Sequence, residues 1–340
     1  MRDLCAGVNV DPGTAAAFRA QWESEVGAIC TGANDADGIY RAVAPKPLLL
    51  KTDHMPGDDV VMTAAIYSLH RAHPGRYQVV VQSKYPEIFF NSPDVLRDVA
   101  GPPTVVQMHY PAIHQSNERG IHFMQAWCEH LGAALGVSVP LATNRPRLYF
   151  DAPAPPVEDF WVVCSGGKRD FTNKLWGHAN YQEVVRALLG KVRFVQVGLA
   201  TDDHRVLDRA HRDLVGQTTM RGLFDVVRRA RGVLCGVSML MHVAAALEKP
   251  AVVVAGGREP TTWNAYPKQQ YLHTVGALPC RSTQGTVGGA CWRSRVVPLG
   301  DATALDRDTC ERPVDGVPEC MGMVKPAEVA ELILRYDRQY

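Results

Sequence analysis

The feature that most constrains the fold of this chain is an alternation of short apolar runs with amphipathic stretches, which occurs twice along the sequence. In the first half, residues 47–53, 77–83 and 104–110 have the pattern of buried strands, and residues 60–73 and 121–136 have helical periodicity. A strand followed by a helix and a second strand forms a βαβ unit, which favours parallel pairing of the two strands.

The same alternation restarts after residue 159. Predicted strands cover 160–167, 192–198, 232–237 and 250–257, and predicted helices cover 181–189, 220–230 and 238–248. Repeated units of this kind predict a mostly parallel sheet with helices on both faces and with ligands at the carboxyl ends of the strands. We therefore predict an α/β fold with two Rossmann-like domains that face each other across a cleft.

A proline-rich stretch over 143–159 lies between the two halves and predicts an extended linker at a domain boundary. The length of 340 residues also suits two domains of roughly 100–200 residues each. We expect the final helix to dock back across the linker. The predicted segments are an N-terminal helical appendage over 1–44, Rossmann-like domains over 45–150 and 151–275, a cysteine-rich segment over 276–324 and a C-terminal helix over 325–340.

Charge and hydropathy narrow the class of protein. Lys and Arg number 36 against 35 Asp and Glu, so the chain lacks the basic field that holds nucleic acid, and we expect no nucleic-acid partner. The N-terminus has no apolar leader region, and no apolar run reaches the ~18 residues that a membrane span needs. We expect a soluble, cytoplasmic protein.

The first stretch that carries chemistry is KTDHMPGDDVVMTAAI over 51–66, where a strand ends and a helix begins with two carboxylates at its mouth. Asp58 and its neighbour can serve simply as helix caps, because the helix dipole favours negative charge at this end. One carboxylate at the carboxyl edge of the sheet can also act as a general base on an acceptor hydroxyl. The residues alone leave both interpretations open.

A second stretch, GVSMLMHVAAALEKPAVVVAGG over 236–257, places Ser238 at the start of a helix whose unpaired N–H groups can hold a phosphate. Neither the P-loop nor the GxGxxG dinucleotide motif is present. His242, one turn into this helix, is either a packed core residue or a contact to a diphosphate or ribose.

A third stretch, SGGKRDFTNKLWGHANY over 165–181, gathers Lys168, Arg169 and Lys174 after a strand. Such cations are either solvated surface charges or the positive charge that a departing pyrophosphate needs, and Lys174 is our candidate for the second role. After a strand end in the first half, His109, Tyr110, His114 and Asn117 either line an acceptor site or belong to a polar loop.

Two of these stretches resemble the signatures of glycosyltransferase family 9, the ADP-heptose-dependent heptosyltransferases. GDDVVMTAAIYSL over 57–69 is similar to the family's N-terminal GDVLLTTPALRAL, and residues 219–257 are similar to its second signature over nearly forty positions. Lys174-Leu175-Trp176 corresponds to the family's Lys-x-Trp element. The resemblance covers roughly 45–270.

The resemblance implies a GT-B fold, with the acceptor bound mainly by the first domain and a nucleotide-sugar donor by the second. It implies inversion at the anomeric carbon, no metal requirement for transfer, and Asp58 as the catalytic base. It also implies a donor-binding set made of Lys174, Thr218, Ser238, Met239, Leu240, Met241, His242 and Gly256. The acceptor is a hydroxyl of a protein or a glycolipid such as lipopolysaccharide core.

One position departs from the family pattern. Where the family has Asp in its Asn-Asp-Ser-Gly segment, this chain has Val237, so a carboxylate that could contact the donor sugar is missing. Two alternatives to a heptosyltransferase therefore stay open: a GT-B transferase that uses another nucleotide sugar, and a catalytically silent GT-B scaffold. The presence of Asp58 and Lys174 argues against the scaffold.

Four of the nine cysteines crowd into 41 residues rich in Gly, Pro and Asp: Cys280, Cys291, Cys310 and Cys320. A Cys₄ site for a structural metal would stabilise such a segment, although its spacings include no CxxC pair, and disulfides or separate thiols are the alternatives. A subset of heptosyltransferases that modify autotransporter proteins carries a four-cysteine iron finger at a similar place. That resemblance implies iron rather than zinc, a protein acceptor and a homo-oligomer.

Overall fold

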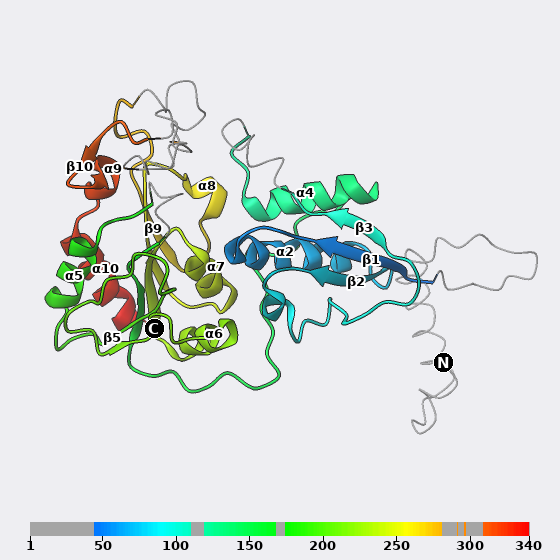
Figure 1. Cartoon of the computed structure of the whole chain (residues 1–340), viewed down its shortest axis with the longest axis horizontal. Helices are drawn as coiled ribbons and strands as arrows, with labels where there is room; N and C mark the ends of the chain where they lie inside the picture. The colour runs from blue at the N-terminus through cyan, green and yellow to red at the C-terminus, as the bar shows by residue number, and fades with distance from the viewer. Residues whose placement is uncertain are drawn as a thin grey trace, which may run out of the picture.

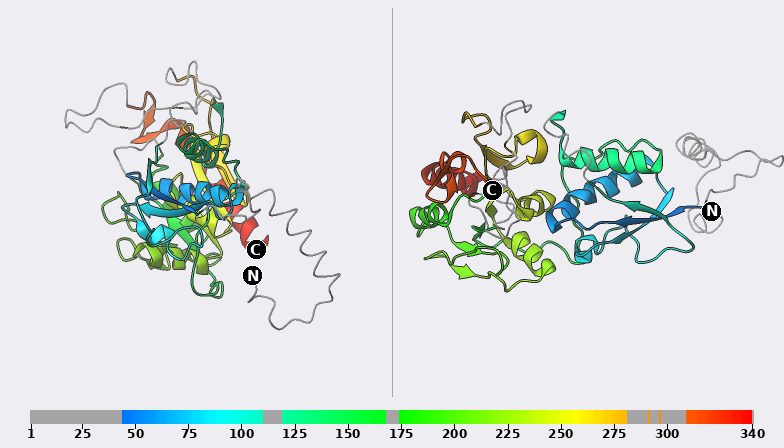
Figure 2. Two further views of the ribbon diagram at one scale, coloured as in Figure 1. Left: turned by 90° about the vertical axis from the view of Figure 1, so that its right-hand side faces the viewer. Right: turned by 45° about the horizontal axis from the view of Figure 1, so that its top comes forward.

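The computed structural model describes residues 44–109, 119–167, 174–280, 291, 296 and 309–339. Within them the chain forms two lobes that lie side by side, each built around its own sheet (Figures 1 and 2). The predicted N-terminal helical appendage over 1–44 lies outside the described residues except for residue 44. Tyr110, His114, Asn117, Lys168 and Arg169 also lie outside them.

The N-terminal lobe has a parallel three-stranded sheet in the order β2-β1-β3, with β1 at Lys46–Lys51, β2 at Tyr77–Gln82 and β3 at Thr104–Gln107. Its helices are α2 (Pro56–Ala72), the short 3-10 helix η1 (Pro86–Phe89) and α4 (Phe123–Leu135). Helix α2 begins four residues before the predicted position 60, because Pro56 suits the first helical turn.

The C-terminal lobe has a parallel six-stranded sheet in the order β6-β5-β4-β7-β8-β9. The predicted strands correspond to β4 (Trp161–Cys164), β5 (Phe194–Gln196), β7 (Gly232–Gly236) and β8 (Ala251–Gly256). Two edge strands, β6 (Arg212–Asp213) and β9 (Gln269–His273), were not predicted, because the first is very short and the second, QQYLH, is largely polar. The prediction of two parallel α/β sheets is confirmed.

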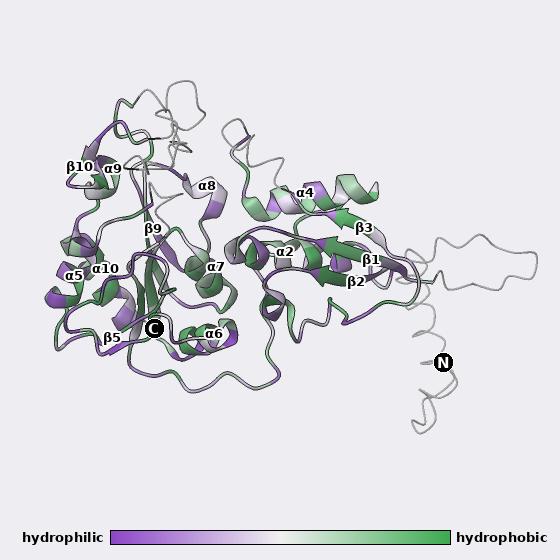
Figure 3. Cartoon of the chain, in the orientation of Figure 1, coloured by the Kyte–Doolittle hydropathy of each residue, from purple (hydrophilic) through white to green (hydrophobic). Residues whose placement is uncertain are grey.

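The helices of this lobe are α5 (His178–Ala187), α6 (Met220–Arg229), α7 (Met239–Ala246), α8 (Thr261–Asn264), α9 (Glu319–Gly322) and α10 (Pro326–Gln339). A small hairpin of β10 (Pro313–Val314) and β11 (Val317–Pro318) precedes α9. The strands are mostly apolar whereas α5 and α6 mix apolar and polar residues (Figure 3). No helix in the described part of the chain is both long and apolar enough to span a bilayer.

The core consists of two hydrophobic clusters. One runs through the N-terminal lobe and continues onto the α6 and α7 face of the C-terminal sheet, so the two lobes share apolar packing. The other lies on the opposite face of the C-terminal sheet, under α5 and α10. Helix α10 thus docks on its own lobe rather than across the linker.

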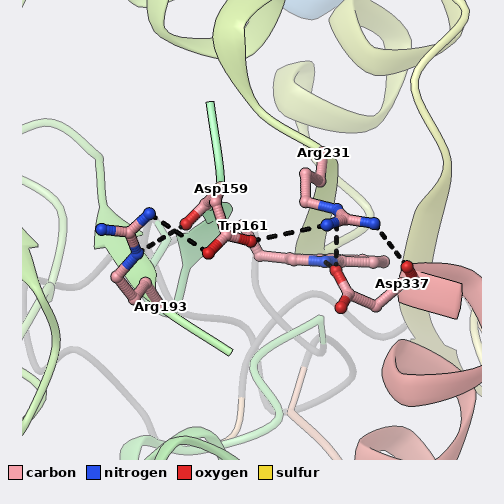
Figure 4. Close-up of polar contacts among 5 residues, drawn as sticks. All are labelled: Asp159, Trp161, Arg193, Arg231 and Asp337. Atoms are coloured by element: carbon pink, nitrogen blue, oxygen red, sulfur yellow. Dashed lines mark hydrogen bonds and ion pairs between the residues drawn. The ribbon is translucent and has the colours of Figure 1, made fainter. Parts of the chain in front are cut away.

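The C-terminal end of α10 is tied to the sheet by polar contacts (Figure 4). Asp337 Oδ1 lies 3.0 Å from Arg231 Nε and accepts a hydrogen bond from Trp161 Nε1 at 3.0 Å. Arg231 also reaches Asp159, which forms a more exposed ion pair with Arg193. These contacts lie at the amino-terminal ends of the strands, on the opposite side of the sheet from the carboxyl ends where the site is expected.

Candidate active site

Asp58 lies in the first turn of α2, directly after the end of β1. Its Oδ2 accepts a hydrogen bond at 3.1 Å from the backbone N–H of Met55, the N-cap residue, and its side chain is half-buried. The capping interpretation is therefore confirmed. It does not compete with the role of base, because a carboxylate has about four lone-pair sites and this bond uses one.

The neighbouring carboxylate, Asp59, has a different environment. It is 1% exposed and accepts hydrogen bonds from Thr52 Oγ1 at 2.8 Å and from Ser83 Oγ. Burial raises the pKa of Asp59, and the two hydrogen bonds oppose that rise. Asp59 thus links the start of α2 to the carboxyl ends of β1 and β2. The sequence did not reveal this contact, because Ser83 is 24 residues away from Asp59.

The first turn of α2 packs directly against the first turn of α7 in the other lobe. A Cβ atom added to Gly57 would lie 3.4 Å from Met239 Cα and 3.5 Å from His242 Cδ2. Each helix starts just past the carboxyl end of a parallel strand, β1 and β7 respectively. The two elements that the sequence assigned to the acceptor and the donor therefore meet at one place.

Helix α7 begins with Ser238 as its N-cap, as predicted, although the side chain makes no capping hydrogen bond. Leu240 and Met241 are 3% and 0% exposed and belong to the core. Of the predicted donor contacts on this helix, those two can offer only backbone N–H groups. Met239 is half-buried beside Gly57.

His242 is buried, and its Nδ1 lies 2.8 Å from the Tyr266 hydroxyl. Burial lowers the pKa of His242 to about 3, and the positive charges of His122 and Lys174 act in the same direction. The imidazole is therefore neutral near pH 7. This geometry supports the packed-histidine interpretation, with Tyr266 as a partner that the sequence did not indicate.

Lys174 forms an ion pair with Glu259, which follows β8 and is 5% exposed. The Lys174 side chain is 28% exposed, so part of it faces solvent. Thr218 is half-buried two residues before α6, and Gly256 ends β8 with φ of 62°, where any Cβ would overlap the Met321 side chain. Glu259 was missed because residues 258–268 matched no motif.

Aromatic contacts join α4 of the first lobe to the segment around α8 of the second. Phe123 and Trp263 stack with ring centroids 5.9 Å apart, and the His122 and Tyr266 rings lie 4.9 Å apart. Burial lowers the pKa of His122 to about 4, and hydrogen bonds to the backbone of Ala265 and Asn264 oppose that shift. These contacts form a second bridge between the lobes.

The four C-terminal cysteines, Cys280, Cys291, Cys310 and Cys320, line one pocket. The pocket wall includes Gly257, whose carbonyl accepts a hydrogen bond from Cys291 N at 3.1 Å. The four cysteines therefore lie around the same cavity. In the described part of the chain, however, no three His, Cys, Asp or Glu side chains are grouped closely enough to hold a metal ion.

Comparison with known proteins agrees with this arrangement. Residues 131–289 match the model of glycosyltransferase family 9 (heptosyltransferase). The match confirms the glycosyltransferase class and the resemblance over Lys174-Leu175-Trp176 and 219–257, and residues 57–69 lie outside it. None of the curated proteins matches the chain.

Solved structures share the fold. TibC of enterotoxigenic E. coli, described as a dodecameric iron-containing heptosyltransferase in complex with ADP-D-β-D-heptose, aligns with a TM-score of 0.61 and 17% identity over 88% of this chain and 79% of that chain. E. coli ADP-heptose lipopolysaccharide heptosyltransferase II aligns with a TM-score of 0.56 and 14% identity over 86% of this chain and 99% of that chain. These alignments confirm the predicted GT-B fold.

Proposed function

Taking glycosyltransferase chemistry from the family match, we propose that this chain is an inverting transferase that moves heptose from ADP-heptose to an acceptor hydroxyl. The observation that carries the proposal is the packing of the Asp58 turn of α2 against the first turn of α7, at Gly57 and Met239. A base that deprotonates the attacking hydroxyl and a helix end that holds the leaving diphosphate must both lie near the same anomeric carbon, and therefore near each other.

In the proposed reaction, Asp58 takes the proton of the acceptor hydroxyl as the oxygen attacks the anomeric carbon. The bond from that carbon to the β-phosphate oxygen breaks, and its electron pair leaves with ADP. Attack opposite to the leaving group inverts the anomeric centre. The N–H groups at the start of α7 and the Lys174 ammonium stabilise the negative charge that develops on the diphosphate.

The donor sugar is the finer part of the proposal. Val237, which replaces the family Asp, is 7% exposed and gives this edge of the site no carboxylate. The diphosphate site depends on backbone groups and is less affected by this change. A different nucleotide sugar is therefore the alternative donor.

Calorimetric titration of the purified protein with ADP-heptose, with ADP and UDP as matched controls, tests this proposal. Micromolar binding of ADP-heptose that is tighter than binding of ADP alone is the expected result. Preference for UDP would establish the alternative donor, and absence of binding to all three would indicate the catalytically silent scaffold.

We further propose that Cys280, Cys291, Cys310 and Cys320 hold a structural metal, with iron preferred to zinc. Four sulfur ligands suit either metal and leave no open position for a substrate, and all four residues line the same pocket. Binding would have to draw the thiols closer together than they lie here. We also propose that the chain forms a homo-oligomer, which is supported by the likeness to TibC, described as dodecameric. The proposed acceptor is a hydroxyl of a protein or a glycolipid.

Metal analysis of protein purified without chelator, together with its mass in solution, tests this second proposal. About one iron per chain is expected. Zinc at the same ratio would change the metal but keep the site, and protein without any metal would remove it.

A further inference from the structure

Glu259 is one of two carboxylates that are less than a tenth exposed in the described part of the chain, the other being Asp59. Burying a carboxylate is costly unless partners compensate it. Three partners surround Glu259: Lys174 forms an ion pair with Oε1, Arg258 Nε lies 3.8 Å from that same oxygen, and Asn264 Nδ2 donates to Oε2. The residue is therefore fixed on both oxygens.

Lys174 is held between Glu259 and the start of α7. The backbone carbonyl oxygen of Lys174 would lie 3.2 Å from a Cβ atom added to Gly236, the last residue of β7. The charge of Lys174 lowers the pKa of His242 within α7. Strand β8, which leads to Glu259, pairs with β7, so the carboxylate reaches Lys174 from the adjacent strand end.

We propose that Glu259 is a positioning residue that holds the Lys174 ammonium ready for the donor diphosphate. The inference rests on the proposed function, in which Lys174 contacts the donor. An ammonium has three donors, so one bond to Glu259 leaves two for phosphate oxygens. A lysine side chain without such a partner would lose rotamer entropy when it orders at the diphosphate, and the ion pair with Glu259 has already restricted its rotamers.

Glu259 can instead weaken donor binding, and the two effects predict opposite changes in ADP affinity for the same substitution. A carboxylate beside an anion site repels the anion, so a Glu259 that only neutralised Lys174 would weaken donor binding. Replacing Glu259 by Gln would then tighten ADP binding. If Glu259 positions Lys174, the same substitution weakens ADP binding, because Gln is uncharged and its single oxygen cannot accept from both Lys174 and Asn264, so the lysine is held less firmly.

A double-mutant cycle on ADP affinity decides between these outcomes. Loss of one charge-assisted hydrogen bond predicts that Lys174→Met and Glu259→Gln each weaken ADP binding about 10-fold to 100-fold. The double variant should bind within about 3-fold of Lys174→Met alone, because Glu259 acts through Lys174. Glu248→Gln, in an exposed ion pair with Arg145 at the far end of α7, is the matched control and should bind ADP like the unchanged protein.

The outcomes separate this inference from the proposed function. Unchanged ADP affinity in Lys174→Met would refute the donor contact itself. A weakened Lys174→Met with an unchanged or tighter Glu259→Gln would refute only the positioning role, as would an equal loss from Glu259→Gln in both backgrounds. If Glu259→Gln does not fold, Glu259→Asp runs the same cycle with the charge kept, and an equal loss in both backgrounds again overturns the inference.

Discussion

Replacing Asp58 by Asn should abolish most transfer while leaving the fold intact. Asn keeps a side-chain oxygen that can accept the Met55 N–H, now 3.1 Å from Asp58 Oδ2, but it cannot take a proton. General-base catalysis contributes about 10²-fold to 10⁴-fold, so kcat should fall by that range. The stability cost is limited to the lost interaction of the charge with the helix dipole, about 0.3–1 kcal/mol.

Asp59 offers a matched comparison one residue away. Asp59→Asn replaces an oxygen that accepts from Thr52 or Ser83 with a donor, which should lower the free energy of unfolding by about 1–3 kcal/mol. Transfer by the folded protein should stay within roughly tenfold of the unchanged rate, because Asp59 is buried below the surface that Asp58 reaches.

Release of ADP from ADP-heptose measures the activity of both variants, with calorimetry for ADP affinity and urea unfolding for stability. A raised pKa is common in catalytic bases, so Asp59 is the rival candidate. Loss of ADP release in Asp59→Asn together with normal release in Asp58→Asn, at equal ADP affinity, would refute our assignment and transfer the role to Asp59.

Three further predictions concern stability. Burial lowers the pKa of His242 to about 3 and that of His122 to about 4, so each neutral histidine stabilises the fold above pH ~6.5 and loses up to about 2 kcal/mol of that stabilisation by pH 5. In urea unfolding, His242→Gln should therefore lose less stability between pH 7 and pH 5 than the unchanged protein. An equal loss of stability would contradict this prediction. Arg231→Ala should cost about 1–3 kcal/mol because Asp337 loses a partly buried partner, whereas Arg193→Ala, which breaks an exposed ion pair, should cost less than about 1 kcal/mol in the same thermal melts; equal losses would argue against α10 docking through Arg231. Cys310→Ser or iron chelation should lower the melting temperature and weaken ADP binding, and unchanged values for both would show that the cysteine pocket does not support the site.

Most of the strands, their parallel pairing and the start of α7 could be predicted from sequence because each depends on local patterns, whereas α2 begins four residues before its predicted start. Val252 to Val254 in β8 form an apolar run, and Ser238 marks a helix start. Side-chain partners could not be predicted in this way. Three pairs illustrate this: Asp59 with Ser83, Lys174 with Glu259 and His242 with Tyr266. In each pair at least one partner lies outside the helices and strands, where the sequence has no periodic pattern that would place its side chain.

The most informative of these missed contacts lie along Gly256 to Glu259, at the end of β8. A Cβ on Gly256 would overlap the Met321 side chain, and one on Gly257 would lie 3.2 Å from Cys320 Sγ, so the two glycines let the cysteine-bearing segment approach the strand end closely. Two residues further on, Glu259 holds Lys174. The cysteine pocket and the proposed donor site therefore share one short backbone segment, and the position of that segment depends on packing from both sides. The cysteine-rich tail thus packs on the same strand end that leads to Glu259, the partner of the lysine proposed to bind the donor.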